Sequence, residues 1–205
     1  MKARFLTLFL FLAVCTQAQQ HEKLVKPFYV RWNTYYSDTL EEQERYFSVR
    51  LPNTFTYDTT TTWASDLNAQ LFAVDFKIDT DPLHAWKSGD YSKPLDLLKY
   101  AQGLTKNDLV ITDSSSVTDW TIDKVVKNIN GFPMIGMQYH LVESFNGLKT
   151  DQDCYLYLIS VFPDAPHAFE KSPHVVYLRF SAKTGKRNVF PDHNPEDIIK
   201  TIKKY

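Results

Sequence analysis

Residues 120–147 have the sequence WTIDKVVKNINGFPMIGMQYHLVESFNG, and this stretch decides the fold. It holds two Asn-Gly pairs, Asn130-Gly131 and Asn146-Gly147, with a strand-length segment between them. Asn-Gly favours a two-residue hairpin turn, because both residues tolerate the positive φ that a type I′ turn requires. The stretch therefore predicts consecutive antiparallel strands, a β-meander.

The strands on either side of the meander indicate how it is covered. Residues 155–162 (YLYLISVF) are apolar at both odd and even positions, and residues 174–180 (HVVYLRF) form the next predicted strand. Successive side chains in a strand point to opposite faces, so a wholly apolar strand requires a layer on each side. Upstream, residues 71–78 (LFAVDFKI) alternate, which predicts a strand buried on one face through Phe72, Val74, Phe76 and Ile78.

A middle helix is predicted over residues 92–103. Ser92 is a suitable N-cap, and Pro94 suits the first turn of a helix. Gly103 is expected to end the helix in a left-handed conformation.

A final helix is predicted over residues 194–204. Asn194 can cap it and Pro195 can start it, and the isoleucines that follow give it an apolar stripe: Ile198, Ile199 and Ile202. We expect this stripe to lie on the sheet. The predicted fold class is therefore α+β, with an antiparallel β-meander sheet sandwiched between helices.

The N-terminus has the layout of a cleavable secretion signal. Lys2 and Arg4 precede an apolar run at residues 5–14 (FLTLFLFLAV), and small residues follow it up to Ala18. The run is too short for a membrane-spanning helix, which needs about 20 apolar residues. We expect cleavage after Ala18 and export of the chain. The alternative is a lipid anchor on Cys15, because that cysteine directly follows the apolar run.

Three parts of the chain are expected on this basis. Residues 1–18 are a predicted signal peptide, residues 19–44 an N-terminal arm, and residues 45–205 a single α+β domain. Within the arm, residues 28–32 (FYVRW) fit either a first strand or a packing arm.

The charge of the chain argues against two classes of partner. The whole chain carries 23 basic and 24 acidic residues, and removal of residues 1–18 leaves a net charge of about −3. Nucleic-acid binding requires a concentrated basic face, which this composition does not supply. Electrostatic docking to an anionic membrane is disfavoured for the same reason.

The order of the predicted segments resembles the PsbP-like family, the α-β-α sandwich of the extrinsic photosystem II subunit and its bacterial relatives. The match spans about residues 45–205. It rests on residues 47–52 (FSVRLP), on the Asn130-Gly131 hairpin leading into Phe132-Pro133, and on the predicted strand and helix that follow. The resemblance implies an accessory or binding domain without known catalysis. No residue of the family's photosystem-binding surface can be placed in this sequence, so no photosynthetic role follows.

Motifs for catalysis or cofactor binding are sparse. No phosphate-binding glycine loop and no metal-ligand spacing of histidines occurs in the sequence, so we expect no cofactor and no metal. Cys154 lies beside apolar residues and is expected to be a buried, unreactive thiol. His140 shares its predicted strand face with Gln138 and is expected in solvent. The alternative function is a secreted hydrolase with an Asp/His/Ser site, suggested by Ser114-Ser115-Ser116 between Asp113 and Asp119.

Aromatic residues are abundant, with 4 Trp and 12 Tyr in the chain. Most fit core packing and strand propensity, but Tyr and Trp also suit a binding surface. Trp86 and Tyr91 lie in a polar segment, and His167 and Phe169 lie in a proline-rich loop. These four are the predicted binding residues. We expect an exported, non-enzymatic binding or accessory protein whose partner is a protein or a small molecule.

Overall fold

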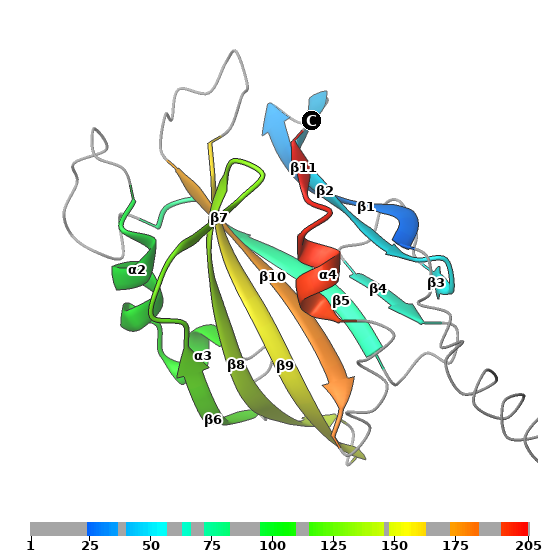
Figure 1. Cartoon of the computed structure of the whole chain (residues 1–205), viewed down its shortest axis with the longest axis vertical. Helices are drawn as coiled ribbons and strands as arrows, with labels where there is room; N and C mark the ends of the chain where they lie inside the picture. Colours follow the sequence, from blue (N-terminus) through cyan, green and yellow to red (C-terminus); the bar gives the residue numbers. More distant parts are fainter. Residues whose placement is uncertain are drawn as a thin grey trace, which may run out of the picture.

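The computed structural model describes residues 24–36, 40–56, 63–66, 72–82, 95–109, 115–145, 148–162, 173–184 and 194–204. Strands dominate this part of the chain (Figure 1). The strands are β1 (Leu24–Tyr36), β2 (Leu40–Pro52), β3 (Phe55–Thr56), β4 (Trp63–Asp66), β5 (Phe72–Asp79), β6 (Ser116–Ile122), β7 (Lys127–Ile129), β8 (Phe132–Phe145), β9 (Leu148–Val161), β10 (His174–Lys183) and β11 (Lys203–Lys204). The helices are α2 (Leu97–Gly103), α3 (Lys106–Leu109) and α4 (Pro195–Ile199).

The strands form two antiparallel sheets. The main sheet has the order β3-β4-β5-β10-β9-β8-β6, and β7 pairs with β8 beside this path. The small sheet has the order β1-β2-β11. Residues 28–32, which fitted either a first strand or an arm, lie in β1, where Phe28 and Val30 are fully buried.

The Asn130-Gly131 turn is confirmed. It joins β7 to β8, with φ of 52° at Asn130 and 89° at Gly131, as a type I′ turn requires. The Asn130 side chain also donates hydrogen bonds to the carbonyl oxygens of Lys200 (3.1 Å) and Ile202 (3.0 Å). The hairpin therefore holds the chain that leaves α4. Asn146-Gly147 lies outside the described residues.

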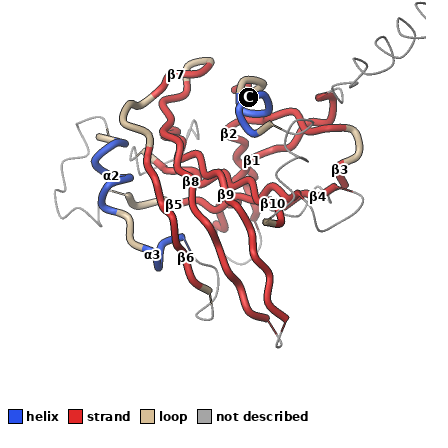
Figure 2. Tube along the Cα trace, turned by 60° about the horizontal axis from the view of Figure 1, so that its bottom comes forward, coloured by secondary structure: helices blue, strands red, loops and turns tan. Residues whose placement is uncertain are grey.

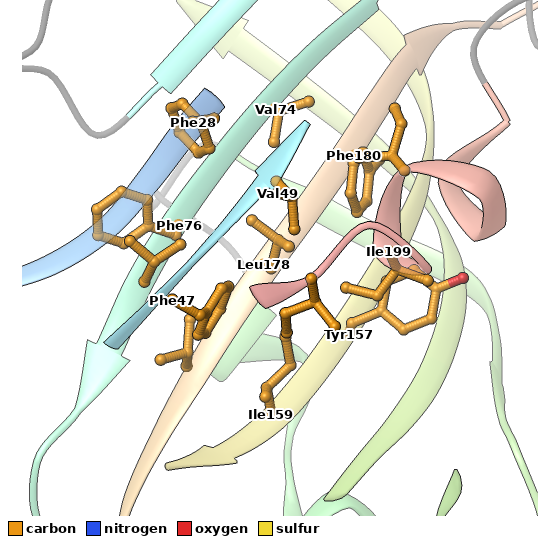
Figure 3. Packing of buried hydrophobic residues seen from close by; sticks show 14 of the residues in the cluster. Phe28, Phe47, Val49, Val74, Phe76, Tyr157, Ile159, Leu178, Phe180 and Ile199 are labelled. Carbon is orange, nitrogen blue, oxygen red and sulfur yellow. The ribbon is translucent and has the colours of Figure 1, made fainter. Parts of the chain in front are cut away.

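Strand β9 is covered on both faces, as its sequence predicts. Tyr157, Ile159 and Val161 belong to one hydrophobic cluster, and Leu156 and Leu158 belong to another. The predicted alternation of β5 is also confirmed, since Val74 and Phe76 are buried in the first cluster (Figure 3).

The two hydrophobic clusters lie between three layers of the structure. The first cluster lies between the main sheet and a layer made of the small sheet and α4, and it includes Ile198 and Ile199 of α4. The second lies between the other face of the main sheet and the helices α2 and α3. Figure 2 shows α2 and α3 on one side of the long strands and β1, β2 and the chain end on the other.

The predicted fold class, an α+β sandwich with the sheet between helices, is wrong. The structure is mostly β-sheet, and the helices in the described part of the chain are short. The face expected to carry a helical layer is covered mainly by the β1-β2-β11 sheet. The apolar residues on both faces of β9 indicate that each face is covered, but they do not indicate by what. A pair of strands can bury the same apolar surface as a helix.

Both predicted helices are shorter than expected. The middle helix begins at Leu97, where Asp96 accepts a hydrogen bond from the Lys99 backbone N–H, and residues 83–94 lie outside the described part of the chain. Gly103 is still helical, and the C-cap is Leu104 with φ −65° instead of a left-handed glycine.

The final helix is capped by Asn194 and started by Pro195, as predicted, but it ends at Ile199. Ile202 is buried, and the next two residues form β11 against β2. No helix in the described residues combines the length and hydropathy needed to cross a membrane.

Candidate functional site

Alternate residues of the four central strands face α2 and α3 in registered rows. Nearest the helices, Lys77, Tyr177, Leu158 and Ile135 lie opposite one another in turn. The next row runs Asp75, Arg179, Leu156 and Met137, and the row after it runs Ala73, Ser181, Cys154 and Tyr139. A charged pair therefore lies on a face that is otherwise largely apolar.

This face is hollow beyond α3. The hollow, which we call the Arg179 pocket, has a volume of about 580 Å³. The side chains of Ala73 and Ser181, in the row next to Asp75 and Arg179, are small and leave part of this space unfilled. The lining residues come from β5, α3, β8, β9 and β10: Ala73, Asp75, Phe76, Lys77, Asp108, Leu109, Tyr139, Glu143, Gln152, Leu156, Tyr177, Arg179 and Ser181.

Arg179 and Asp75 form a partly buried ion pair across the β5–β10 ladder. Arg179 Nε donates to both carboxylate oxygens of Asp75, at 3.1 and 2.9 Å. Arg179 is only 8% exposed, whereas the Asp75 side chain is 29% exposed. The carboxylate is therefore the member of the pair that a molecule in the pocket can reach.

Burial and pairing act against each other on both charges. Burial raises the pKa of Asp75 above its ordinary value, although Arg179 pulls it down. Burial alone would lower the pKa of Arg179, but the Asp75 carboxylate, with Tyr139 and Cys154, outweighs it and raises that pKa. Arg179 consequently keeps its charge at every physiological pH.

Lys77 lies at the end of the pocket near the helices. Its Nζ donates to the backbone carbonyl of Asp108 and lies 4.4 Å from the centre of the Tyr177 ring. Burial lowers the pKa of Lys77, against the opposing influence of Asp108. Its ammonium is thus fixed at the rim by a carbonyl and an aromatic face.

Polar groups also mark the opposite end of the pocket. Gln152 on β9 lies two rows beyond the row of Asp75 and Arg179, and Glu143 on β8 lies three rows beyond it. Their side chains are 3.4 Å apart. Between the two ends lie apolar groups such as Leu109, Leu156 and the Tyr139 ring. The pocket is therefore polar at both ends, and its middle combines apolar groups with the Asp75–Arg179 pair.

Cys154 lies in the row beneath Arg179 and is not a nucleophile. It is 1% exposed, and burial raises the pKa of its thiol to about 12. A neutral, inaccessible thiol does not attack substrates. The predicted burial of Cys154 is confirmed.

The predicted binding residues cannot be compared with this pocket. Trp86, Tyr91, His167 and Phe169 all lie outside the described residues. Sequence reasoning missed Asp75 and Arg179. A signal exists for both, since Arg179 is charged in the apolar segment HVVYLRF and Asp75 shares the segment LFAVDFKI with only one other charge, Lys77.

Among the described residues, His140 lies near a carboxylate and a hydroxyl but does not have the geometry of a hydrolase relay. His140 Nδ1 lies 3.4 Å from Asp153 Oδ1 and 3.5 Å from Thr184 Oγ1. A Ser-His-Asp relay needs the carboxylate and the hydroxyl on opposite ring nitrogens, and here both meet the same one. His140 is half-buried instead of fully in solvent.

The predicted Ser/Asp cluster is only partly described. Ser116 is exposed and pairs with Val142 at the start of β6, Asp119 is exposed, and Asp113 and Ser114 lie outside the described residues. Within the described ranges, no group of three His, Cys, Asp or Glu residues could hold a metal ion.

Comparison with known proteins finds no family model that matches the chain and no curated protein with significant similarity. The resemblance to the PsbP-like family therefore stays a prediction.

Proposed function

We propose that this protein is an exported binding protein without catalytic activity, and that the Arg179 pocket holds its ligand. The ligand is a small molecule with an apolar middle and hydrogen-bonding groups at both ends. The polarity of the pocket supports this class, because the Lys77 end and the Glu143 end are polar and apolar side chains lie between them around the Asp75–Arg179 pair. A volume of about 580 Å³ lies in the range of small-molecule sites, roughly 300–1,000 Å³.

The observation that carries the proposal is the partly buried Asp75–Arg179 pair beside a hollow. Removing two charges from water is costly, and apolar residues of similar volume often stabilise a protein as well or better. The neighbouring small residues, Ala73 and Ser181, leave space in front of the pair instead of filling it. Stability alone favours neither feature, but a ligand that uses the Asp75 carboxylate explains both.

The charge of the pocket favours a neutral ligand. Arg179 is already compensated by Asp75, and Lys77 is held by the Asp108 carbonyl. Glu143 adds a carboxylate that an anionic ligand would meet. Amides and hydroxyls, which hydrogen-bond without bringing charge, suit both ends.

Two further observations support the non-enzymatic and exported parts of the proposal. The thiol in the pocket wall is neutral, and His140 lacks the geometry of a relay. Export rests on residues 1–18, whose charged start, apolar run and small residues before Ala18 are typical of a signal peptide.

Saturation-transfer NMR with a set of neutral fragments tests the binding function. Each fragment carries one apolar ring system with an amide or hydroxyl group at both ends. We expect several to bind the wild-type protein and none to bind Ser181→Leu, because the leucine side chain fills the hollow. Ser116→Leu is the matched control, since it adds the same bulk at an exposed strand position outside the pocket.

Circular-dichroism melting confirms that both variants are folded. Binding that is equal in wild type and a folded Ser181→Leu variant would exclude the Arg179 pocket as the site. The absence of binding by every fragment would contradict the proposed ligand class.

A further inference from the structure

We propose that the opposite face of the main sheet carries a second binding site, a cleft for a neutral oligosaccharide. The cleft, which we call the Tyr157 cleft, has a volume of about 710 Å³. Its lining comes from β6, the β6–β7 turn, β7, β8, β9 and the start of α4: Thr121, Ile122, Asp123, Lys124, Lys127, Gly136, Met137, Gln138, Tyr155, Leu156, Tyr157, Asn194, Pro195 and Glu196.

The floor of the cleft is set by strand register. Gly136 on β8 lies opposite Tyr157 on β9, and Gln138 lies opposite Tyr155 in the adjacent row. Two tyrosines thus lie side by side on one face, next to a residue without a side chain. The start of α4 and the β6–β7 turn form the walls.

Gly136 allows the Asp123 carboxylate to lie directly on the sheet. A Cβ at position 136 would lie 2.9 Å from Asp123 Oδ2 and 3.8 Å from the Tyr157 ring. The Asp123 backbone N–H also donates to the Gly136 carbonyl at 2.9 Å. Because Gly136 has no side chain, the Asp123 carboxylate and the Tyr157 ring both lie next to it on the floor of the cleft.

Tyr157 is a buried residue whose hydroxyl has no hydrogen-bond partner among the residues that the structure describes. The residue is 9% exposed, and its ring packs against Phe180 with 5.9 Å between ring centres. Figure 3 shows the hydroxyl at the margin of the cluster, directed away from Ile159 and Leu178. A buried hydroxyl left unsatisfied costs about 1–3 kcal/mol, so such groups are rare unless something binds to them.

The carboxylates of Glu196 and Asp123 interact electrostatically with the Tyr157 hydroxyl. Burial raises the pKa of Tyr157, and the negative charges of Glu196 and Asp123 raise it further. The phenol therefore stays protonated and can donate to a ligand oxygen.

The lining specifies the chemistry of the ligand. Asp123 and Glu196 balance Lys124 and Lys127, so the cleft favours neither an anion nor a cation. The Lys127 ammonium is 3.3 Å from the Asp123 carboxylate.

The ligand's groups must satisfy a mixture of donors and acceptors. Carboxylates accept, ammonium groups and the Tyr157 phenol donate, and the amides of Gln138 and Asn194 do both. A hydroxyl group can form a hydrogen bond with each of these groups, because it both donates and accepts. A sugar also presents C–H groups to an aromatic ring, and Tyr155 is the more exposed of the two tyrosines on the floor.

Isothermal titration calorimetry with defined oligosaccharides tests the proposal. The probes are neutral linear gluco-, xylo- and galacto-oligosaccharides, with an oligogalacturonate as the acidic counterpart. We expect a neutral oligosaccharide to bind, and Tyr157→Phe to weaken that binding about tenfold, as the loss of one hydrogen bond predicts. Glu196→Gln is expected to weaken it in the same direction.

Tyr100→Phe is the matched control. Tyr100 is also buried, but its hydroxyl donates to Asp79 Oδ2 at 2.6 Å and lies on the other face of the sheet. We expect Tyr100→Phe to lower the melting temperature and to leave oligosaccharide binding unchanged. Tyr157→Phe should keep or raise the melting temperature, because it removes an unsatisfied buried group.

Three results would overturn the proposal: no neutral oligosaccharide binds, the oligogalacturonate binds more tightly than every neutral probe, or Tyr157→Phe binds as well as wild type. The cleft and the Arg179 pocket lie on opposite faces of the sheet, so either site can fail without the other.

Discussion

Arg179 carries its charge on a strand face where its neighbours along β10 are Tyr177 and Ser181. Its charge is retained because Asp75 lies directly opposite on β5. Neither member of the pair is isolated from the pocket, and Asp75 is the more exposed of the two. The candidate site therefore contains an ion pair in which removal of either residue would leave the other charge without compensation.

A double-mutant cycle measures that dependence. Asp75→Leu leaves a buried guanidinium uncompensated and is expected to lower the free energy of unfolding by about 3 kcal/mol. The double variant Asp75→Leu with Arg179→Met should be less destabilised than Asp75→Leu, because it buries no charge. Urea unfolding measures the wild type, Asp75→Leu, Arg179→Met and the double variant. A double variant that is as unstable as the sum of its single variants would show that the pair is not coupled.

The pH dependence of an Arg179→Met variant follows from the raised pKa of Asp75. Without Arg179, which lowers that pKa, the pKa should rise further. A carboxyl whose folded pKa exceeds its unfolded value stabilises the protein at low pH and loses this contribution as the pH rises through the folded pKa. Arg179→Met should therefore approach the stability of Asp75→Asn with Arg179→Met as the pH falls towards about 4, the ordinary value for Asp. A stability gap that stays constant with pH would contradict this reading of Asp75.

Cys154 offers a direct check on the burial of this face. In a Cys15→Ser chain, the Cys154 thiol should react with a water-soluble disulfide reagent at pH 8 only after the protein is unfolded, because its pKa is about 12. Rapid reaction of the native protein would mean that the wall of the Arg179 pocket opens in solution.

The β7–β8 hairpin is the element that links the main sheet to the C-terminal segment. Its turn has two residues with positive φ, and its Asn130 side chain holds the carbonyls that follow α4. The same asparagine thus has a backbone role and a side-chain role.

Two substitutions separate these roles. Asn130→Gly keeps the positive φ and removes the side-chain bonds, so we expect a loss of about 1–2 kcal/mol and faster amide exchange at residues 200–204. Gly131→Ala places a Cβ at φ 89°, which should cost about 1 kcal/mol or more through backbone strain. Unchanged exchange at residues 200–204 in Asn130→Gly would show that the hairpin does not hold the C-terminal segment.

At the scale of elements, sequence patterns specify what depends on nearby residues. The Asn130-Gly131 turn, the two-faced burial of β9 and the Asn194-Pro195 start of α4 are all set by neighbouring residues, and the structure confirms them. The end of α4 was predicted wrongly, because the isoleucine stripe does not distinguish a further helical turn from a buried Ile202 leading into a strand.

The overall fold depends on pairing between distant segments, which local sequence patterns do not predict. The layer on the β1–β2 side arises because a hairpin, not a helix, covers Val74, Phe76 and Leu178. The Asp75–Arg179 pair joins residues 104 positions apart, and no local pattern indicates that β5 lies beside β10. The same holds for the Tyr157 cleft, whose walls come from β6, β7 and α4.

NMR titration of the ¹⁵N-labelled protein with the best fragment from the screen tests whether the Arg179 pocket binds a ligand. We expect amide shift changes concentrated in residues 73–77, 152–156 and 179–181, and we expect them to disappear in Ser181→Leu but to persist in Ser116→Leu. Shift changes that centre elsewhere on the molecule, or that persist in a folded Ser181→Leu variant, would contradict binding at the Arg179 pocket.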